Sequence, residues 1–274
     1  MTDRYAVIGN PIGHSKSPFI HTTFARETSQ DLTYVALDAP VGGFAQRVDA
    51  FRAEGGRGMN VTLPFKLDAC AYATDLADSA RLAGAANALK FEGDRVHAEN
   101  FDGLGLIRDI QINLGFPLAG KRVLMLGAGG AARGATLPLL DAGVARIVIA
   151  NRTFFRASEV AGQFAGHGEV AAVAASELAL LEPFDLVINA TSASLAGASP
   201  EVPAGCFAYG CLGYEMLYGK GLTPFLRLAK AAGAARLADG AGMLVEQAAE
   251  AFAWWRGIRP ETAPVIAAMS APLV

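Results

Sequence analysis

The fold follows from one run of residues, Lys121-Arg122-Val123-Leu124-Met125-Leu126-Gly127-Ala128-Gly129-Gly130-Ala131-Ala132. Its first half is almost wholly apolar, as expected of a central parallel strand that is covered on both faces. Glycines then lead into a helical segment that continues through Leu140. Such a turn lets backbone N–H groups approach a pyrophosphate at the positive end of the helix. The run therefore predicts a dinucleotide site at Gly127–Ala131, and a tight structural turn is the alternative.

The next two predicted strands, Arg146–Ala150 and Asp185–Asn189, extend this into a strand–helix–strand series of the dinucleotide-binding type. An NAD enzyme would carry a carboxylate after the first of them, to bind the ribose 2′-OH. The sequence has Asn151-Arg152-Thr153 instead, and the Arg152 guanidinium offers a fork of donors that suits a 2′-phosphate. Arg156 lies a helical step further on. The pattern favours NADP, and arginines on a solvated surface are the alternative.

Length and composition limit the class of protein. The chain has 274 residues, a formal net charge of −3 and 52% hydrophobic residues, which suits two ordinary domains with a sizeable core. The near-neutral charge argues against nucleic acid or a membrane as a partner. Three cysteines without metal-ligand spacing predict neither disulfides nor a metal. With no signal peptide or membrane span expected, we predict a soluble cytoplasmic protein.

The N-terminal part reads as a second α/β unit. Strands are expected at Tyr5–Gly9, Leu32–Leu37 and Gly58–Thr62, and a helix at Phe44–Glu54. Ser17-Pro18 predicts a helix start, with the serine as N-cap and the proline at the first helical position. The fold class is therefore α/β with two domains. The C-terminal segment 243–255 has helical spacing and is expected to pack back on the first unit.

Three polar clusters lie in the first unit, and each taken singly has a structural explanation. Ser15-Lys16-Ser17-Pro18 places two hydroxyls at a helix N-terminus, where a small carboxylate is well held. Asn60-Val61-Thr62-Leu63-Pro64-Phe65-Lys66 places an amide, a hydroxyl and an amine at a strand end. Asp102-Gly103-Leu104-Gly105 adds a carboxylate before turn glycines. Capping, or a solvated lysine, would account for each cluster alone.

Together with the glycine-rich loop and Asn151-Arg152-Thr153, these clusters resemble the shikimate dehydrogenase family. The resemblance runs from Asn10-Pro11-Ile12-Gly13-His14-Ser15-Lys16-Ser17-Pro18 to Ala238-Asp239-Gly240-Ala241-Gly242-Met243-Leu244-Val245-Glu246-Gln247-Ala248-Ala249. It implies a substrate-binding α/β domain at 1–101 plus 238–274 and a Rossmann-type NADP domain at 102–237, with the active site in the cleft between them. The implied reaction is the reversible, NADP-dependent reduction of 3-dehydroshikimate to shikimate, within aromatic amino acid biosynthesis.

The resemblance also assigns roles to residues that match the family pattern. Lys66 and Asp102 would be the catalytic pair that relays the proton of the reacting hydroxyl. The substrate would be bound by Ser15, Ser17, Asn60, Thr62, Asn87, Tyr218 and Gln247. NADP would be surrounded by Asp78, Gly127, Ala128, Gly129, Gly130, Ala131, Asn151, Arg152, Thr153, Arg156, Met216 and Gly240. The expected state is a monomer or homodimer.

Three positions depart from the family pattern. Phe101 and Ala88 replace threonines near the expected site, and Glu215 replaces an aspartate upstream of Tyr218. Phe101 either fills space that the substrate ring would use, or points into the core while its backbone keeps register. The alternatives to a shikimate dehydrogenase are therefore a related enzyme acting on quinate or an amino analogue, and a low-activity NADP-binding sensor. The intact Lys66–Asp102 pair argues against a sensor.

Overall fold

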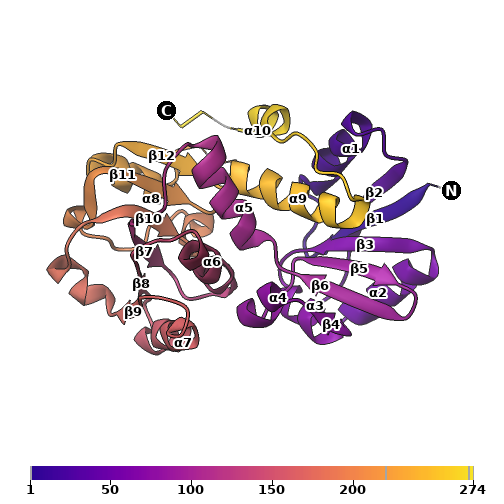
Figure 1. The fold of residues 1–274 in the computed structure, drawn as a ribbon, viewed down its shortest axis with the longest axis horizontal. Helices are drawn as coiled ribbons and strands as arrows, with labels where there is room; N and C mark the ends of the chain where they lie inside the picture. The colour runs from indigo at the N-terminus through magenta and orange to yellow at the C-terminus, as the bar shows by residue number, and fades with distance from the viewer. Residues whose placement is uncertain (1, 220, 271, 274) are drawn as a thin grey trace. The chain divides into compact units, whose positions relative to one another are not determined.

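The computed structural model describes residues 2–219, 221–270, 272 and 273. The chain divides into two compact units, coloured by residue number in Figure 1. The first unit comprises Met1–Gly105 and Val245–Val265, and the second comprises Leu106–Leu244 and Ile266–Val274. Residues 266–270 lie with the second unit. The α/β fold class predicted from the sequence is confirmed.

The first unit is built on a mixed six-stranded sheet with the order β2-β1-β3-β5-β6-β4. Its strands are β1 (Asp3–Gly9), β2 (Leu32–Asp38), β3 (Gly56–Val61), β4 (Asp75–Leu76), β5 (Ala88–Glu92) and β6 (Arg95–Glu99). β1 pairs in parallel with β2 and β3, whereas β5 is antiparallel to both β3 and β6. The β5–β6 hairpin was not predicted from the sequence, although Gly93-Asp94 is a turn signal between two alternating segments.

The helices of the first unit are α1 (Ser17–Glu27), α2 (Phe44–Ala53), α3 (Lys66–Tyr72) and α4 (Asp78–Ala83), with the part of α9 (Ala241–Arg256) from Val245 onward. Trp255 of α9 is buried, and its indole N–H donates to the Leu89 carbonyl at 3.0 Å. A Cβ at Gly58 would lie 2.7 Å from that indole nitrogen, so β3 needs a glycine there. α9 therefore packs on the first sheet, as the sequence predicted.

The second unit is a wholly parallel six-stranded sheet with the order β12-β11-β10-β7-β8-β9. Counted from β7, this is the 3-2-1-4-5-6 order of the Rossmann fold. The strands are β7 (Arg122–Leu126), β8 (Arg146–Ala150), β9 (Val170–Val173), β10 (Phe184–Asn189), β11 (Phe207–Glu215) and β12 (Arg236–Asp239). Of these strands, β7, β8 and β10 were predicted because they are continuous apolar runs. β11 was not predicted, nor were β9 and β12, which are short, half-buried edge strands.

The helices of the second unit include α6 (Gly130–Asp141), α7 (Phe154–Phe164), α8 (Pro224–Ala231) and α10 (Ala263–Met269), whose last residues belong to it. α5 (Asp102–Arg108) enters it from the first unit and continues as a π-helix, Asp109–Asn113. Short 3₁₀ turns lie at Ala175–Leu180, Ala193–Ala196 and Ala204–Cys206. Over the described residues, no helix has the length and apolar character needed to cross a bilayer, and no group of side chains is arranged to hold a metal ion.

α1 begins one residue earlier than predicted, and the prediction that Ser17 is its N-cap was wrong. The helix starts at Ser17, and Lys16 precedes it without a side-chain cap. The Ser15 hydroxyl instead accepts a hydrogen bond from the Ser17 N–H at 3.3 Å. Ser17 itself is buried and lies against Tyr34 of β2.

His21 is buried on α1 and faces the same part of the core. Its ring stacks on Tyr34, with centroids 4.2 Å apart and planes within 3°. Neither ring nitrogen has a hydrogen-bond partner among the described residues. Burial lowers the pKa of His21 to about 3, although the nearby Asn60 side chain opposes this slightly. His21 is therefore neutral in the folded protein at ordinary pH.

This neutral histidine predicts a pH-dependent stability. The unfolded chain takes up a proton below about pH 6.5 and the folded chain does not, so stability is lost as pH falls from 6.5 towards 3. Between pH 7 and pH 5 the wild type should lose about 2 kcal/mol more than a His21→Phe variant. Urea unfolding at both pH values measures the difference. A variant at the exposed His14 serves as the control, and equal losses in wild type and His21→Phe would contradict the prediction.

Candidate active site

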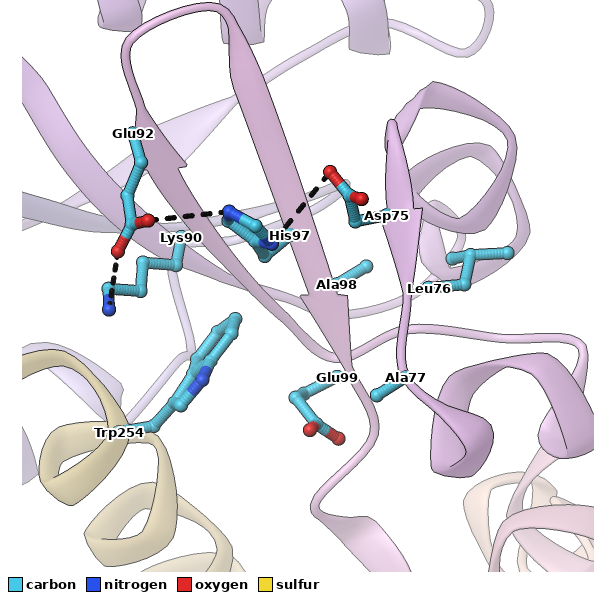
Figure 2. A pocket seen from close by; sticks show the side chains of 9 residues that line it. All are labelled: Asp75, Leu76, Ala77, Lys90, Glu92, His97, Ala98, Glu99 and Trp254. Atoms are coloured by element: carbon cyan, nitrogen blue, oxygen red, sulfur yellow. Dashed lines mark ion pairs between the residues drawn. The ribbon is translucent and has the colours of Figure 1, made fainter.

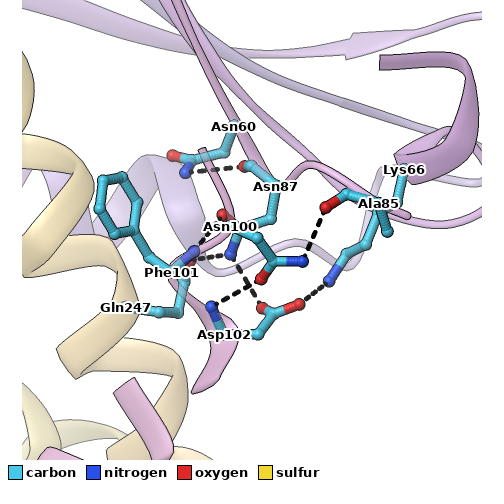
Figure 3. A network of polar contacts seen from close by, with 8 residues as sticks. All are labelled: Asn60, Lys66, Ala85, Asn87, Asn100, Phe101, Asp102 and Gln247. Carbon is cyan, nitrogen blue, oxygen red and sulfur yellow. Dashed lines mark hydrogen bonds and ion pairs between the residues drawn. The ribbon is translucent and has the colours of Figure 1, made fainter. Parts of the chain in front are cut away.

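Lys66 and Asp102 form a close ion pair in the first unit (Figure 3). Lys66 Nζ lies 2.5 Å from Asp102 Oδ2. Lys66 is the first residue of α3, which begins after a turn closed by the Phe65 N–H and the Thr62 carbonyl. Buried Phe65 anchors this turn in the core. The two side chains are 26% and 12% exposed, so the pair is mostly shielded but reachable from solvent.

Two asparagines hold the Asp102 carboxylate and its backbone. Asn87 Nδ2 donates to Asp102 Oδ1 at 2.9 Å, and the Asp102 N–H donates to Asn100 Oδ1 at 3.0 Å. Asn100 Nδ2 in turn donates to the Ala85 carbonyl at 2.8 Å. The carboxylate therefore has a fixed orientation, with one oxygen held by an amide and the other by the Lys66 amine (Figure 3).

Gln247 and Asn60 extend this network. Gln247 Oε1, on α9, accepts from Asn87 Nδ2 at 3.1 Å. Asn60 Nδ2, on β3, donates to the Asn87 carbonyl at 3.3 Å. The structure thus brings together five of the residues that the sequence resemblance placed at the catalytic and substrate site, namely Asn60, Lys66, Asn87, Asp102 and Gln247. The resemblance named these residues, and the structure adds the hydrogen bonds that connect them.

The other predicted substrate residues lie apart from this network or in the other unit. Ser15 is half-buried and Ser17 is buried, both at the start of α1. Thr62 is half-buried just after β3, and its methyl group faces Gly9. Tyr218 belongs to the second unit, where burial raises the pKa of its hydroxyl.

Phe101 points into the core, which settles the alternative left open by the sequence. Its side chain is 9% exposed and packs edge-on against Trp254, with ring centroids 5.8 Å apart. Buried Ala88 belongs to the same apolar cluster. The Phe101 N–H still donates to Asn87 Oδ1 at 2.9 Å, so the backbone keeps its place in the network (Figure 3). The aromatic ring therefore adds to the core and does not occupy the space beside Asp102.

A polar recess of about 320 Å³ lies elsewhere in the first unit (Figure 2). Its lining residues come from β4, β5, β6 and α9, namely Asp75, Leu76, Ala77, Lys90, Glu92, His97, Ala98, Glu99 and Trp254. Lys90 Nζ pairs with Glu92 at 2.6 Å, and His97 Nε2 lies 3.4 Å from the same carboxylate. Lys66 and Asp102 do not line it. The recess is therefore separate from the catalytic pair, and its lining carries three carboxylates but a single lysine.

In the second unit the glycine-rich loop joins β7 to α6. Gly127 has φ +104°, and a Cβ there would lie 3.2 Å from the Ala190 carbonyl oxygen, so glycine is required by the fold itself. Gly129 and Gly130 are different, because nothing lies within 4 Å of their Cβ positions and both are exposed. That open space at the N-terminus of a 12-residue helix suits close approach of a phosphate to the backbone.

The end of β8 carries two exposed arginines and no carboxylate. Arg152 lies just after β8, and Arg156 lies in the first turn of α7. Asn151 Nδ2 folds back onto the Thr153 carbonyl at 2.9 Å, which shapes the loop between strand and helix. Two cations in this loop suit an adenosine 2′-phosphate. Asp78 belongs instead to the first unit, where its exposed carboxylate pairs with Arg81.

Glu215 organises the carboxyl ends of β10 and β11. The carboxylate is fully buried and accepts from Asn189 Nδ2 at 3.0 Å, Ser194 Oγ at 2.6 Å and Thr223 Oγ1 at 3.0 Å. These donors were missed by sequence reasoning, since they come from three separate places, namely the end of β10, the 3₁₀ turn Ala193–Ala196 and the N-cap of α8. Met216 follows directly, and a Cβ at Gly240 would lie 2.2 Å from its carbonyl oxygen. The predicted cofactor residues Met216 and Gly240 are therefore neighbours.

Comparison with family models identifies relatives along most of the chain. The model described as "Shikimate dehydrogenase substrate binding domain" matches residues 7–89. "Shikimate / quinate 5-dehydrogenase" matches residues 110–199, and "Shikimate 5'-dehydrogenase C-terminal domain" matches residues 240–269. The order of the three matches follows the two units and the shared helix α9 described above.

Individual proteins support the same grouping. The chain is 55% identical over 273 residues to the shikimate dehydrogenase (NADP(+)) of Nitrosospira multiformis, covering 100% of this chain and 99% of that protein. The crystal structure of an Ael1 enzyme from Pseudomonas putida is 55% identical with a TM-score of 0.94, covering 99% of this chain and 100% of that one. The shikimate 5-dehydrogenase of Thermus thermophilus, in complex with NADP(H) and shikimate, is 32% identical with a TM-score of 0.86, covering 97% of this chain and 98% of that one.

The packing of Phe101 predicts the result of restoring the threonine that the family pattern has at this position. Phe101→Thr removes a buried ring from its contact with Trp254 and should lower the free energy of unfolding by roughly 3 kcal/mol. Chemical denaturation measures this change. Phe155, which is 69% exposed, provides a matched Phe→Thr control with little expected effect. Equal stability of the Phe101→Thr variant and the wild type would show that the ring is not part of the core.

Proposed function

The chain belongs to the shikimate dehydrogenase family, and from that premise we propose that it catalyses the NADP-dependent interconversion of shikimate and 3-dehydroshikimate. The observation that carries the proposal is the Lys66–Asp102 pair, oriented by Asn87 and reachable from solvent. Oxidation of an alcohol requires a group that takes the hydroxyl proton as hydride leaves the carbinol carbon. An amine and a carboxylate 2.5 Å apart can hold and relay that proton.

The first unit supplies the groups that the substrate needs. Ser15 and Ser17 present hydroxyls at the N-terminus of the 11-residue helix α1, whose positive end favours a carboxylate. Asn87 contacts Asp102 directly and Gln247 contacts Asn87, so both amides lie near the catalytic pair and can bind the hydroxyl groups of the substrate ring. We propose that these residues, with Asn60 and Thr62, bind shikimate so that its reacting hydroxyl faces Lys66 and Asp102.

The second unit has the residues that suit NADP. When bound, NADP+ supplies the hydride acceptor. The exposed backbone at Gly129 and Gly130 would hold the pyrophosphate, and Arg152 and Arg156 would hold the 2′-phosphate. Roles for Asp78, Met216, Tyr218 and Gly240 stay predictions, as do a cytoplasmic location and the state as a monomer or homodimer.

Removal of the Lys66 amine tests the catalytic role. Lys66→Ala should lower kcat for shikimate oxidation by about 10²–10⁴-fold and change KM much less, because the amine acts on the proton in transit. Initial rates of NADPH formation measure both constants. Lys90→Ala is the matched control, since Lys90 is a half-buried, ion-paired lysine of the same unit. Near-normal turnover by Lys66→Ala would remove Lys66 from the mechanism.

The cofactor preference can be tested at the end of β8. The double variant Arg152→Ala/Arg156→Ala removes the charged donors that we assign to the 2′-phosphate, and KM for NADP+ should rise by roughly 10–100-fold. KM for NAD+, which lacks that phosphate, should change little and serves as the internal control. If both constants rose equally, the arginines would be supporting the loop and not reading the phosphate.

A further inference from the structure

Tyr34 is a buried tyrosine of β2 that no step of the proposed reaction uses. Its side chain is 7% exposed, and its hydroxyl donates to Asn60 Oδ1 at 2.6 Å. The Ser17 side chain lies against the same phenol oxygen. Tyr34 therefore stands between two elements of the proposed substrate site, the start of α1 and the end of β3.

The direction of every hydrogen bond from Asp102 back to Asn87 is fixed by chemistry. An ionised carboxylate can only accept, so Asn87 must present its NH₂ group to Asp102 Oδ1. The Asn87 Oδ1 atom then faces the Phe101 N–H, which can only donate, at 2.9 Å. Asn87 cannot turn its amide over without losing both contacts.

The same logic continues from Asn87 to Tyr34. The Asn87 carbonyl can only accept, so Asn60 must present its NH₂ group to it. The Asn60 Oδ1 atom consequently faces Tyr34, and the phenol O–H must donate to it. The hydrogen bond that the Tyr34 hydroxyl donates to Asn60 Oδ1 thus holds the Asn60 amide in the required orientation.

The packing of the Tyr34 ring keeps its hydroxyl in position to donate to Asn60 Oδ1. The neutral His21 ring stacks on it at 4.2 Å, and both rings are almost completely buried. A phenol ring fixed on one face by a parallel neighbour has little freedom to move its hydroxyl away from Asn60. The stack also supports the start of α1, because His21 lies one turn beyond Ser17.

We propose that Tyr34 is a positioning residue for the dehydrogenase reaction, which acts through Asn60 and Asn87 on the orientation of Asp102. The proposal rests on the proposed function, because that function gives Asp102 its catalytic role. Without the phenol hydroxyl, Asn60 Oδ1 is a buried acceptor without its donor. Asn60 then either bears that cost or rotates and turns its oxygen towards the Asn87 carbonyl. The rotated state sets two oxygens against each other at the Asn87 carbonyl, which also accepts from the Val61 N–H at 2.8 Å, and we expect it to act through the Asn87 backbone on the amide that supports the Asp102 carboxylate.

The test is Tyr34→Phe, which keeps the stacked ring and removes only the hydroxyl. We expect kcat/KM for shikimate to fall about tenfold, while KM for NADP+ stays unchanged. Tyr72→Phe is the matched control, because the Tyr72 hydroxyl bonds Asp49 and Arg52 outside the network. A Tyr34→Phe enzyme with wild-type kcat/KM, alongside an active wild type, would overturn the inference and leave the proposed function standing.

A double-mutant cycle with Asn60→Ala separates positioning from direct contact. If Tyr34 acts through Asn60, adding Tyr34→Phe to Asn60→Ala should lower kcat/KM by no more than about twofold further. Fully additive losses would mean that the phenol acts independently of Asn60, which overturns the proposed route. The same four proteins, unfolded in urea, test the Tyr34–Asn60 bond without substrate, and absence of coupling there would also overturn it. A wild type that did not turn over shikimate would refute the proposed function separately.

Discussion

The contact between Lys66 and Asp102, which is mostly shielded from solvent, is the constraint on which the arrangement of the candidate active site depends. A carboxylate only 12% exposed is costly to hold unless its oxygens are satisfied, and here one oxygen meets the Lys66 amine and the other meets the Asn87 amide. Each partner comes from a different element, at the starts of α3 and α5 and beside β5. Sheet, turn and helix starts must therefore be in register for the pair to form.

The departures from the family pattern are accommodated without disturbing this contact. Phe101 places its ring against Trp254 in the core and keeps its N–H on Asn87. Glu215 accepts hydrogen bonds from neutral donors at the end of β10, in a 3₁₀ turn and at the N-cap of α8, and so holds together the carboxyl ends of β10 and β11. In both cases a change of side chain alters packing or loop support, while the groups assigned to the reaction keep their positions.

Sequence alone predicted those parts of the structure that depend on local chemistry. The apolar run Val123–Leu126 and the glycines after it indicated a buried parallel strand and a phosphate loop, and the structure confirms the α/β fold. The β5–β6 hairpin was missed because its strands are only five residues long and partly apolar, although the Gly93-Asp94 turn between them was a usable signal. The Ser17 cap was wrong because the helix already includes Ser17, whose N–H is bonded to the Ser15 hydroxyl. The direction of the Asn60 and Asn87 amides depends on partners distant in sequence, so no local pattern could specify it.

The most direct test of the account is a comparison of initial rates for shikimate and quinate, each with NADP+ and with NAD+. The intact Lys66–Asp102 pair, the Asn87–Gln247 amides and the arginines after β8 predict rapid turnover with shikimate and NADP+, and much slower turnover in the other three combinations. Faster turnover of quinate, or a preference for NAD+, would contradict it.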